Sequence, residues 1–330
     1  MRVRHLVPAP LRRAAARLAT APRSAGTRMA LAALARDARP IVLGPWVGEV
    51  GFELLYWVPF VRWFAEEYRL PPERLIAVTR GGAGSWYAPF AARAVDALTF
   101  LEPGDFLARN QARRDRLGEQ KQIAWTPLDE EILALVKRKE GRDVAVLHPS
   151  VMYRLFAPYW WGHQPIGWIR RHTRYVRMQP PGIQIDLPEQ YTAVKFYFND
   201  CFRNTPENCA FVKRTVRRLA DEGPVVSLST GVAVDDHGPC EPDIAAMAGI
   251  RHLLAPDTNL LVQSAVVARA RRFVGTYGGF AYLAPLYGVP ATSYYTDPDG
   301  FSVRHLNVVK SVLDAAGESH LLEVSSASDR

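Results

Sequence analysis

The chain has 330 residues, enough for one large or two medium-sized domains, and its 48% hydrophobic and 22% charged residues are typical of a soluble globular protein. No run of about 18 apolar residues occurs, so the sequence predicts no membrane-spanning helix. The three cysteines have no Cys-x-x-Cys spacing, which argues against a zinc site or a disulfide framework and favours a reducing cytoplasm.

The net charge of +8 is concentrated at the N-terminus. Residues 1–40 contain nine arginines and one acid, Asp37, whereas the rest of the chain has 32 basic and 32 acidic side chains. The body of the protein is therefore no basic nucleic-acid platform, and we expect no nucleic-acid partner. Residues 1–39 form a basic Ala/Arg-rich arm, interpreted as a solvated extension, as a segment on an anionic membrane surface, or as an organellar transit peptide.

Short β-branched runs then alternate with helical patterns, which is typical of parallel sheets with crossover helices. In the first half, strands are predicted at 40–43, 75–79, 97–101 and 144–148, and helices at 52–68, 86–96 and 127–139. Residues 151–178 break the alternation, with seven aromatic residues, five arginines and no acid. We expect residues 40–185 to form a Rossmann-like domain that carries this aromatic and basic insertion.

A second alternating set follows a proline-rich connector. Strands are predicted at 191–198, 225–228, 251–254, 272–274 and 291–294, and helices at 206–221, 244–248, 259–270, 280–287 and 301–316. Residues 186–330 are the expected second Rossmann-like domain. The predicted fold class is thus α/β, with two Rossmann-like domains in tandem and a cleft between them.

The first polar turn is GPWVGEVGFELLYW, residues 44–57, directly after the predicted strand at 40–43. Its glycines allow a ligand to approach the backbone, and the helix that follows points its amides at the same place. Glu49, flanked by Gly48 and Gly51, is interpreted as a general base or as a loop-stabilising acceptor. Glu53 lies in the first helical turn, where a carboxylate is favoured by the helix dipole alone.

Further polar residues follow other predicted strands. His148 closes the strand at 144–148, as a candidate base or as a histidine satisfied by the backbone. Lys195 lies inside the apolar strand at 191–198, which Asn199 directly follows, and its charge needs a partner, either a diphosphate or an internal acid. Thr230 and Gly231 end the strand at 225–228, where small residues suit a base or a ribose.

The most specific pattern is the stretch 271–301. A strand leads into Thr276, Tyr277, Gly278 and Gly279, and a helix that contains Tyr282 follows, so its first amides form an anion cradle. A second strand then ends in Thr296-Asp297-Pro298.

This stretch resembles the nucleotide-sugar half of GT-B glycosyltransferases, particularly the heptosyltransferase-like branch. The resemblance rests on Tyr277-Gly278-Gly279, Gly288-Val289-Pro290 and Thr296-Asp297-Pro298, and on Gly48-Glu49, which corresponds to a Gly-Asp turn in that branch. It implies a nucleotide-sugar donor in residues 186–330, an acceptor domain in residues 40–185, and Lys195 as a donor-diphosphate ligand. Glu replaces Asp at position 49, and Tyr282 lies where the branch has a nearby histidine.

The expected function is therefore the transfer of a sugar from a nucleotide diphosphate to a glycan or lipid-linked acceptor. Inversion at the anomeric carbon is the expected stereochemical outcome. The candidate catalytic residues are Glu49, Glu53 and His148. The candidate donor-binding residues are Lys195, Asn199, Thr230, Gly231, Thr276, Tyr277, Gly278, Gly279 and Tyr282. The candidate acceptor-binding residues are Gly48, Trp46, Arg154, Trp160 and Trp161, because aromatic rings stack on sugars and arginine pairs with phosphate.

No cofactor beyond the co-substrate and no metal are expected, since Asp235-Asp236-His237 is interpreted as a surface turn. The alternatives are a different reaction on the same scaffold, such as sugar-nucleotide epimerisation or pyruvyl transfer, and a non-catalytic membrane-associated binding protein. A cytoplasmic location is expected, with peripheral contact at the inner membrane face through the N-terminal arm.

Overall fold

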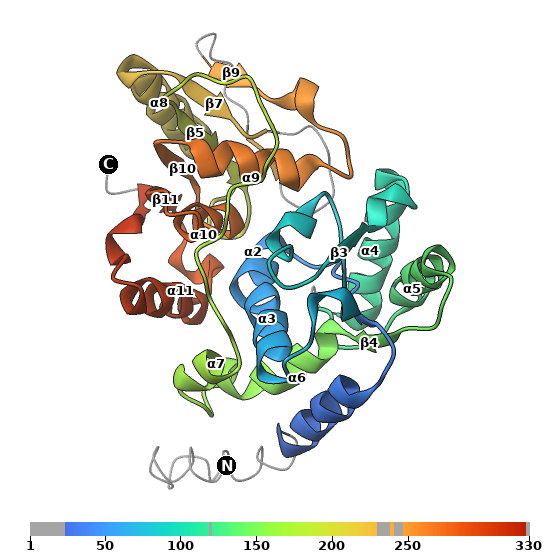
Figure 1. Ribbon diagram of the computed structural model, residues 1–330. Helices are drawn as coiled ribbons and strands as arrows, with labels where there is room; N and C mark the ends of the chain where they lie inside the picture. Colours follow the sequence, from blue (N-terminus) through green and yellow to red (C-terminus); the bar gives the residue numbers. More distant parts are fainter. Residues whose placement is uncertain (1–23, 119–120, 230–237, 241–246, 328–330) are drawn as a thin grey trace, which may run out of the picture.

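The computed structural model describes residues 24–118, 121–229, 238–240 and 247–327, and it contains two parallel β-sheets (Figure 1). The first sheet has the strand order β3-β2-β1-β4. Its strands are β1 (Ile41–Leu43), β2 (Leu75–Thr79), β3 (Arg93–Asp96) and β4 (Ala145–Leu147), and all their pairings are parallel. This is the order of one half of a Rossmann fold.

The second sheet has the order β12-β11-β10-β5-β7-β9. Counted along the chain, this is the order 3-2-1-4-5-6 of a doubly wound sheet. The strands are β5 (Thr192–Lys195), β7 (Val225–Ser227), β9 (Met247–Gly249), β10 (Arg272–Thr276), β11 (Ala291–Tyr295) and β12 (Leu322–Ser326). A short antiparallel pair, β6 (Tyr197–Phe198) and β8 (Gly238–Pro239), lies beside it. The predicted α/β fold of two Rossmann-like domains is confirmed.

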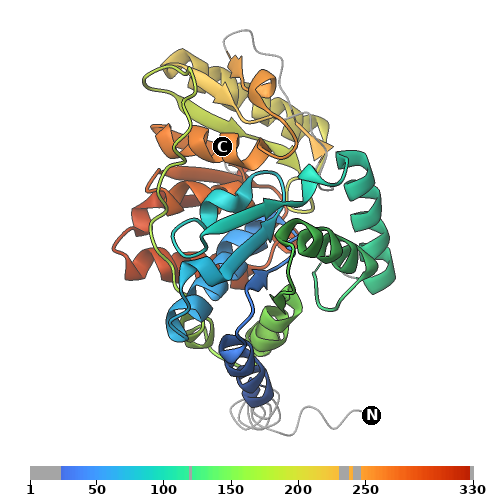
Figure 2. The same ribbon diagram turned by 45° about the vertical axis from the view of Figure 1, so that its right-hand side comes forward.

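Helices cover both sheets, as Figures 1 and 2 show. In the first domain they are α2 (Val50–Phe52), a π-helix (Glu53–Trp57), α3 (Val58–Glu67), α4 (Pro103–Leu117), α5 (Pro127–Glu140), α6 (Pro149–Trp160) and α7 (Gly167–Arg171). In the second they are α8 (Pro206–Glu222), α9 (Asn259–Arg269), α10 (Gly279–Leu286) and α11 (Val303–Ala315). Residues 24–36 add a helix before β1.

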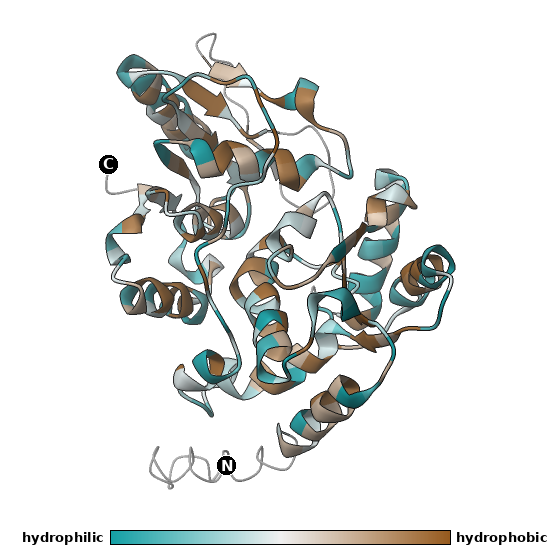
Figure 3. Cartoon of the chain, in the orientation of Figure 1, coloured by the Kyte–Doolittle hydropathy of each residue, from teal (hydrophilic) through white to brown (hydrophobic). Residues whose placement is uncertain are grey.

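Local signals explain where several helices begin and end. At α5, Thr126 and Asp129 form a capping box and Pro127 takes the first helical position, while Gly141 ends the helix with φ of 66°. At α8, the Thr205 side chain accepts a hydrogen bond from the Asn208 amide. In Figure 3 the strands of the first sheet are largely hydrophobic, whereas the outer helices α4 and α5 alternate hydrophilic and hydrophobic residues.

Four predicted elements are wrong. The predicted helix at 86–96 contains instead the last residue of a 3₁₀ turn (Ala83–Trp86) and strand β3, and the predicted strand at 97–101 contains a 3₁₀ turn (Ala97–Thr99). The Asp96 side chain accepts from the Leu98 amide and so starts that turn. The predicted strand at 251–254 contains a 3₁₀ turn (Arg251–Leu253). Of the predicted helix at 244–248, residues 244–246 lie outside the described residues, and the last two residues belong to β9 (Met247–Gly249). Helix α4 and strand β12 were not predicted.

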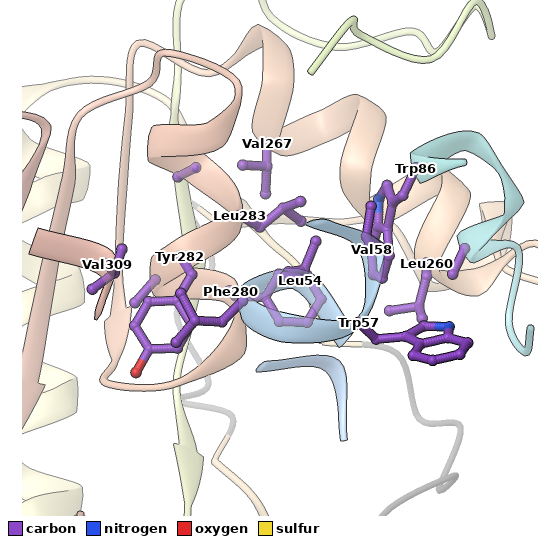
Figure 4. Packing of buried hydrophobic residues seen from close by; sticks show 14 of the residues in the cluster. Leu54, Trp57, Val58, Trp86, Leu260, Val267, Phe280, Tyr282, Leu283 and Val309 are labelled. Atoms are coloured by element: carbon purple, nitrogen blue, oxygen red, sulfur yellow. The ribbon is translucent and has the colours of Figure 1, made fainter. Parts of the chain in front are cut away.

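The two domains share one hydrophobic core. A single cluster of buried residues includes Leu43 of the first sheet and Phe273 of the second. Figure 4 shows Leu54 of the first domain beside Phe280 and Leu283 of α10, and Trp57 beside Leu260 of α9. Polar bonds also cross the interface, from Trp86 Nε1 to Ser264 Oγ at 3.0 Å and between Tyr56 Oη and His305 Nδ1 at 2.6 Å.

Candidate active site

The predicted site residues lie at the points where strand order reverses. In the first sheet the reversal is between β1 and β4, which are followed by Gly44 and His148. In the second it is between β5 and β10, which end at Lys195 and Thr276. Doubly wound sheets bind ligands outside the carboxyl ends of the strands at such switch points. Among the described residues, Gly44 and His148 of the first sheet and Lys195 and Thr276 of the second therefore lie at the carboxyl ends of the strands beside these switch points.

Buried side chains hold the turn after β1. The Trp46 amide donates to Val78 O at 2.8 Å, and the Val47 amide donates to Gln122 Oε1 at 3.0 Å. The Val47 carbonyl accepts from Asn110 Nδ2 at 3.1 Å. A guanidinium nitrogen of Arg80 donates to the Gly48 carbonyl. Because several backbone amides and carbonyls of residues 46–48 are hydrogen-bonded, the backbone enters the next residue, Glu49, in one defined direction.

Glu49 is partly buried and directly precedes α2, and its carbonyl accepts from the Glu53 amide at 3.1 Å. Cations lie in its surroundings. Burial lowers the pKa of Arg113, and the nearby carboxylates of Asp129 and Glu49 oppose that shift. Lys121 Nζ lies 5.9 Å from the ring centre of Phe52, three residues after Glu49. The role of Glu49 as a base stays a prediction.

Glu53 is completely buried, so in this structure it contacts protein groups. Tyr87 Oη donates to Glu53 Oε1 at 2.7 Å, and Arg80 Nη1 lies 3.5 Å from Glu53 Oε2. Burial raises the pKa of Glu53 to about 7, and Arg80 and the Tyr87 hydrogen bond act in the opposite direction. The Glu53 carboxylate thus forms a buried ion pair with Arg80, the residue that also donates to the Gly48 carbonyl.

His148 is also buried and is the N-cap of α6. Its Nδ1 accepts from the Ser150 amide at 3.2 Å, and its Nε2 lies 3.4 Å from Asp129 Oδ1. Its ring stacks on Trp125 with 4.4 Å between centroids. The Nδ1 contact fits a histidine satisfied by the backbone, whereas Nε2 is buried without a hydrogen-bond partner in the described structure, so the role of His148 as a base stays a prediction.

Lys195 lies at the end of β5, with its ammonium group between α9 and α10. Its Nζ donates to Gln263 Oε1 at 2.5 Å and lies 3.9 Å from the ring centre of Phe280. Two contacts of its ammonium group are therefore an amide oxygen and an aromatic face. Gly275 pairs with Lys195 across the sheet, so this lysine is next to the turn at 276–279.

The turn at 276–279 is packed against protein. Thr276 Oγ1 accepts from the Tyr197 amide at 3.0 Å and donates to the Tyr197 carbonyl at 2.9 Å. Tyr282 Oη donates to Tyr277 Oη at 2.7 Å, and both rings are buried. A Cβ on Gly278 would lie 1.9 Å from Tyr197 Oη. These side chains fix the turn, and their expected contacts with a donor stay predictions.

Three further donor candidates were predicted from the sequence. Asn199 Oδ1 accepts from the Cys201 and Phe202 amides at 3.1 Å and 2.9 Å, which is a turn-forming role. Thr230 and Gly231 lie outside the described residues.

The acceptor candidates divide into buried and surface residues. Trp46 is fully buried and stacks on Trp57 with 5.7 Å between centroids, so in this structure it is a core residue. Gly48 packs against the Trp46 ring. Trp160 is partly exposed, with Lys121 Nζ 5.9 Å from its ring centre, and Trp161 is 61% exposed. Arg154 is exposed and donates to Ser150 Oγ at 3.3 Å.

The two turns expected on opposite walls of a cleft touch each other. A Cβ on Gly279, the first residue of α10, would lie 2.7 Å from the Gly51 amide nitrogen and 3.0 Å from Val50 Cγ1. The missing side chains at Gly51 and Gly279 therefore let α2 and α10 approach closely.

Replacing Gly279 by alanine is expected to cost about 1–3 kcal/mol of unfolding free energy, because the added methyl group meets backbone that cannot turn aside. Denaturant unfolding measures this cost. Gly104→Ala in α4 is the matched control, since a Cβ there has open space and alanine favours a helix. Equal stability of the two variants would contradict the close helix approach.

The sequence contains one possible metal-binding pattern that the expectation of no metal did not consider. Asp297-Pro298-Asp299 has Asp-x-Asp spacing. Asp297 caps the 3₁₀ turn Pro298–Gly300 and pairs with Arg203 at 3.1 Å. Within the described ranges, no group of three or more His, Cys, Asp or Glu could hold a metal ion. Asp235-Asp236-His237 lies outside those ranges, and metal independence stays a prediction.

No protein-family model matches this chain, and no curated protein matches it. Solved structures do match. The ADP-heptose LPS heptosyltransferase II of E. coli is 13% identical over 87% of this chain and 89% of its own, with a TM-score of 0.43. The glycosyltransferase TibC from enterotoxigenic E. coli H10407 is 12% identical over 78% of this chain, with a TM-score of 0.40, and this chain spans only 58% of its length.

The UDP-GlcNAc 2-epimerase of Methanocaldococcus jannaschii is 9% identical over 87% of this chain and 88% of its own, with a TM-score of 0.35. Two of these three proteins are glycosyltransferases, the class whose motifs the sequence resembles. All three TM-scores are below 0.5, so the function proposed below rests on the residues of this chain.

Sequence reasoning missed the residues that hold the site together. Arg80 is 32 residues from Gly48, Gln122 is 75 residues from Val47, and His305 is 249 residues from Tyr56. Asp129 also contacts His148, in a different element. A signal existed for Arg80 alone, because it directly follows β2 at the carboxyl edge of the first sheet.

Proposed function

We propose that this protein is a metal-independent glycosyltransferase that moves a sugar from a nucleotide-diphosphate donor to a glycan or lipid-linked acceptor, with inversion at the anomeric carbon. The observation that best supports the proposal is the meeting of the two switch points. Glu49 is two residues from Gly51, which touches Gly279, and Gly279 begins α10 beside Lys195.

Displacement at an anomeric carbon needs a base for the acceptor proton and positive or dipolar groups for the leaving diphosphate. Glu49 would accept the proton of the acceptor hydroxyl. Lys195 and the amides at the start of α10 would bind the diphosphate, since a helix N-terminus and a lysine both favour negative charge. The acceptor hydroxyl attacks the anomeric carbon while the bond from that carbon to the diphosphate breaks. In this proposal no metal ion is needed for either event.

Peripheral contact with an anionic membrane is part of the proposal. The helix at 24–36 lies at the same end of the molecule as α7 in Figure 1. Burial lowers the pKa of His172, and Arg171 and Arg28 are near enough to act in the same direction. Met29 is 73% exposed, and Arg170 and Arg171 are also exposed. Among the described helices, none has the length and apolar character needed to cross a bilayer.

Thermal unfolding in the presence of UDP-, GDP-, ADP- and dTDP-sugars tests the donor side. A matching sugar nucleotide at 100 times its Kd is expected to add about 2.7 kcal/mol of stability, because it binds only the native state. Lys195→Met is expected to lose most of this shift, whereas Lys213→Met, on the exposed face of α8, is expected to keep it.

Two outcomes of the screen would contradict the proposal. Stabilisation by none of the sugar nucleotides favours pyruvyl transfer or a binding protein. Conversion of the sugar nucleotide without any acceptor favours an epimerase.

A further inference from the structure

Arg80 is a buried arginine whose guanidinium joins two parts of the first switch point. It directly follows β2 and is 2% exposed. One terminal nitrogen donates to the Gly48 carbonyl, and the other lies 3.5 Å from Glu53 Oε2. Arg80 thus spans from the residue before Glu49 to the first residue of the π-helix.

The counter-ion of Arg80 is itself held in place. Glu53 receives the Tyr87 hydroxyl at 2.7 Å, and Tyr87 is completely buried. Asp96, at the end of β3, also lies within electrostatic range of Arg80, and its carboxylate accepts from the Gly82 and Leu98 amides. Glu53 of the π-helix and Asp96 of β3 therefore favour one position of the Arg80 guanidinium. Because a guanidinium is planar, it can donate hydrogen bonds only in a few fixed directions.

Buried hydrogen bonds also hold the residues before Glu49. Trp46 and Val47 are tied through Val78, Gln122 and Asn110, while the Gly48 carbonyl is tied to Arg80. Gly48 lacks a side chain that could fix its own conformation, so the bond to Arg80 limits its rotation.

We propose that Arg80 is the positioning residue of the Gly48–Glu49 turn, with Glu53 and Tyr87 fixing its orientation. Arg80 acts through the Gly48 carbonyl and sets the direction in which Glu49 leaves the turn. The catalytic meaning of this role rests on the proposed function. The positioning itself is a property of the free protein and can be measured without a substrate.

Three variants separate positioning from charge balance. Removing Arg80 alone would leave Glu53 buried beside no counter-ion, so the test uses the double variant Arg80→Met/Glu53→Gln, in which neither charge is left unpaired. Glu53→Gln alone keeps the bond from Arg80 to Gly48. Arg62→Met removes another buried arginine of the same domain, one that packs over the Phe90 ring at 4.8 Å.

Amide hydrogen exchange at Trp46 and Val47 is the first readout, since both amides are hydrogen-bonded in the turn. In the double variant these amides are expected to exchange at least tenfold faster, while those of β1 and β2 keep their native rates. Arg62→Met is expected to leave the exchange of the turn unchanged. Glu53→Gln loosens Arg80 without removing its bond to Gly48, so it is expected to accelerate the exchange less than the double variant does.

Two results would overturn the inference: slow exchange at Trp46 and Val47 in the double variant, or an equal acceleration in β1 and β2, which would indicate a loss of global stability only. Once a donor and an acceptor are known, the double variant is expected to lower kcat at least tenfold relative to Glu53→Gln, with the donor KM within twofold. A wild-type protein that turns over no sugar nucleotide would refute the proposed function, and the exchange result would still decide the role of Arg80.

Discussion

Replacing Glu49 by glutamine is expected to lower kcat by about 10²–10⁴ with a matched donor and acceptor, because the amide keeps the size of the side chain and cannot accept a proton. The donor KM is expected to change little, since the proposed diphosphate ligands are in the second domain. Steady-state kinetics on the purified variant measure both quantities.

Glu102 provides a matched control. Like Glu49 it is the N-cap of a helix, with φ and ψ of −62° and 142° against −69° and 148°, and in both cases no side-chain capping bond forms. Glu102→Gln is expected to leave kcat unchanged. If Glu49→Gln keeps turnover within twofold of the wild type while folding normally, Glu49 is not the base.

Replacing Asp129 by alanine is expected to lower the free energy of unfolding by about 3–5 kcal/mol, because the change leaves several buried donors without an acceptor. Asp129 is completely buried. It accepts from the Thr126 amide at 2.8 Å, the Thr126 hydroxyl at 2.6 Å and Gln122 Nε2 at 3.2 Å, and His148 Nε2 lies 3.4 Å away. Equilibrium denaturation in guanidinium chloride measures the loss.

Glu131, on the same helix, is the control for Asp129. Its ion pair with Arg109 is at the surface, with both side chains more than 40% exposed. Surface pairs contribute about 0–1 kcal/mol, so Glu131→Ala is expected to change stability by no more than that. If both variants lose a similar free energy of unfolding, the buried Asp129 hydrogen bonds contribute no more to stability than the exposed Glu131–Arg109 pair does.

The element pattern could be predicted where periodicity and end signals agreed. Strand β2 has the bounds read from its β-branched residues, and α5 and α8 begin at prolines that follow threonine caps. The segment 86–96 failed because its alanines and aromatic residues fit a helical pattern. In the fold its last four residues form the edge strand β3, whose pairing with β2 is a long-range contact.

The site was harder to predict than the fold, because one residue type can satisfy two physical needs. A glycine at 51 or 279 suits the close approach of a phosphate, and it equally suits the close approach of another backbone, which is what the structure contains. The partners of Glu53 could not be found either. Arg80 and Tyr87 are 27 and 34 residues away, and only the folded sheet brings them together.

The shared hydrophobic core has a consequence for cooperativity. Buried residues of both sheets belong to one cluster, so neither domain can expose its inner face to water without disrupting the packing of the other. The chain should therefore melt in one transition. A cut in the connector between the domains would leave two fragments that remain associated, and large rotations between the domains would require this common core to be repacked.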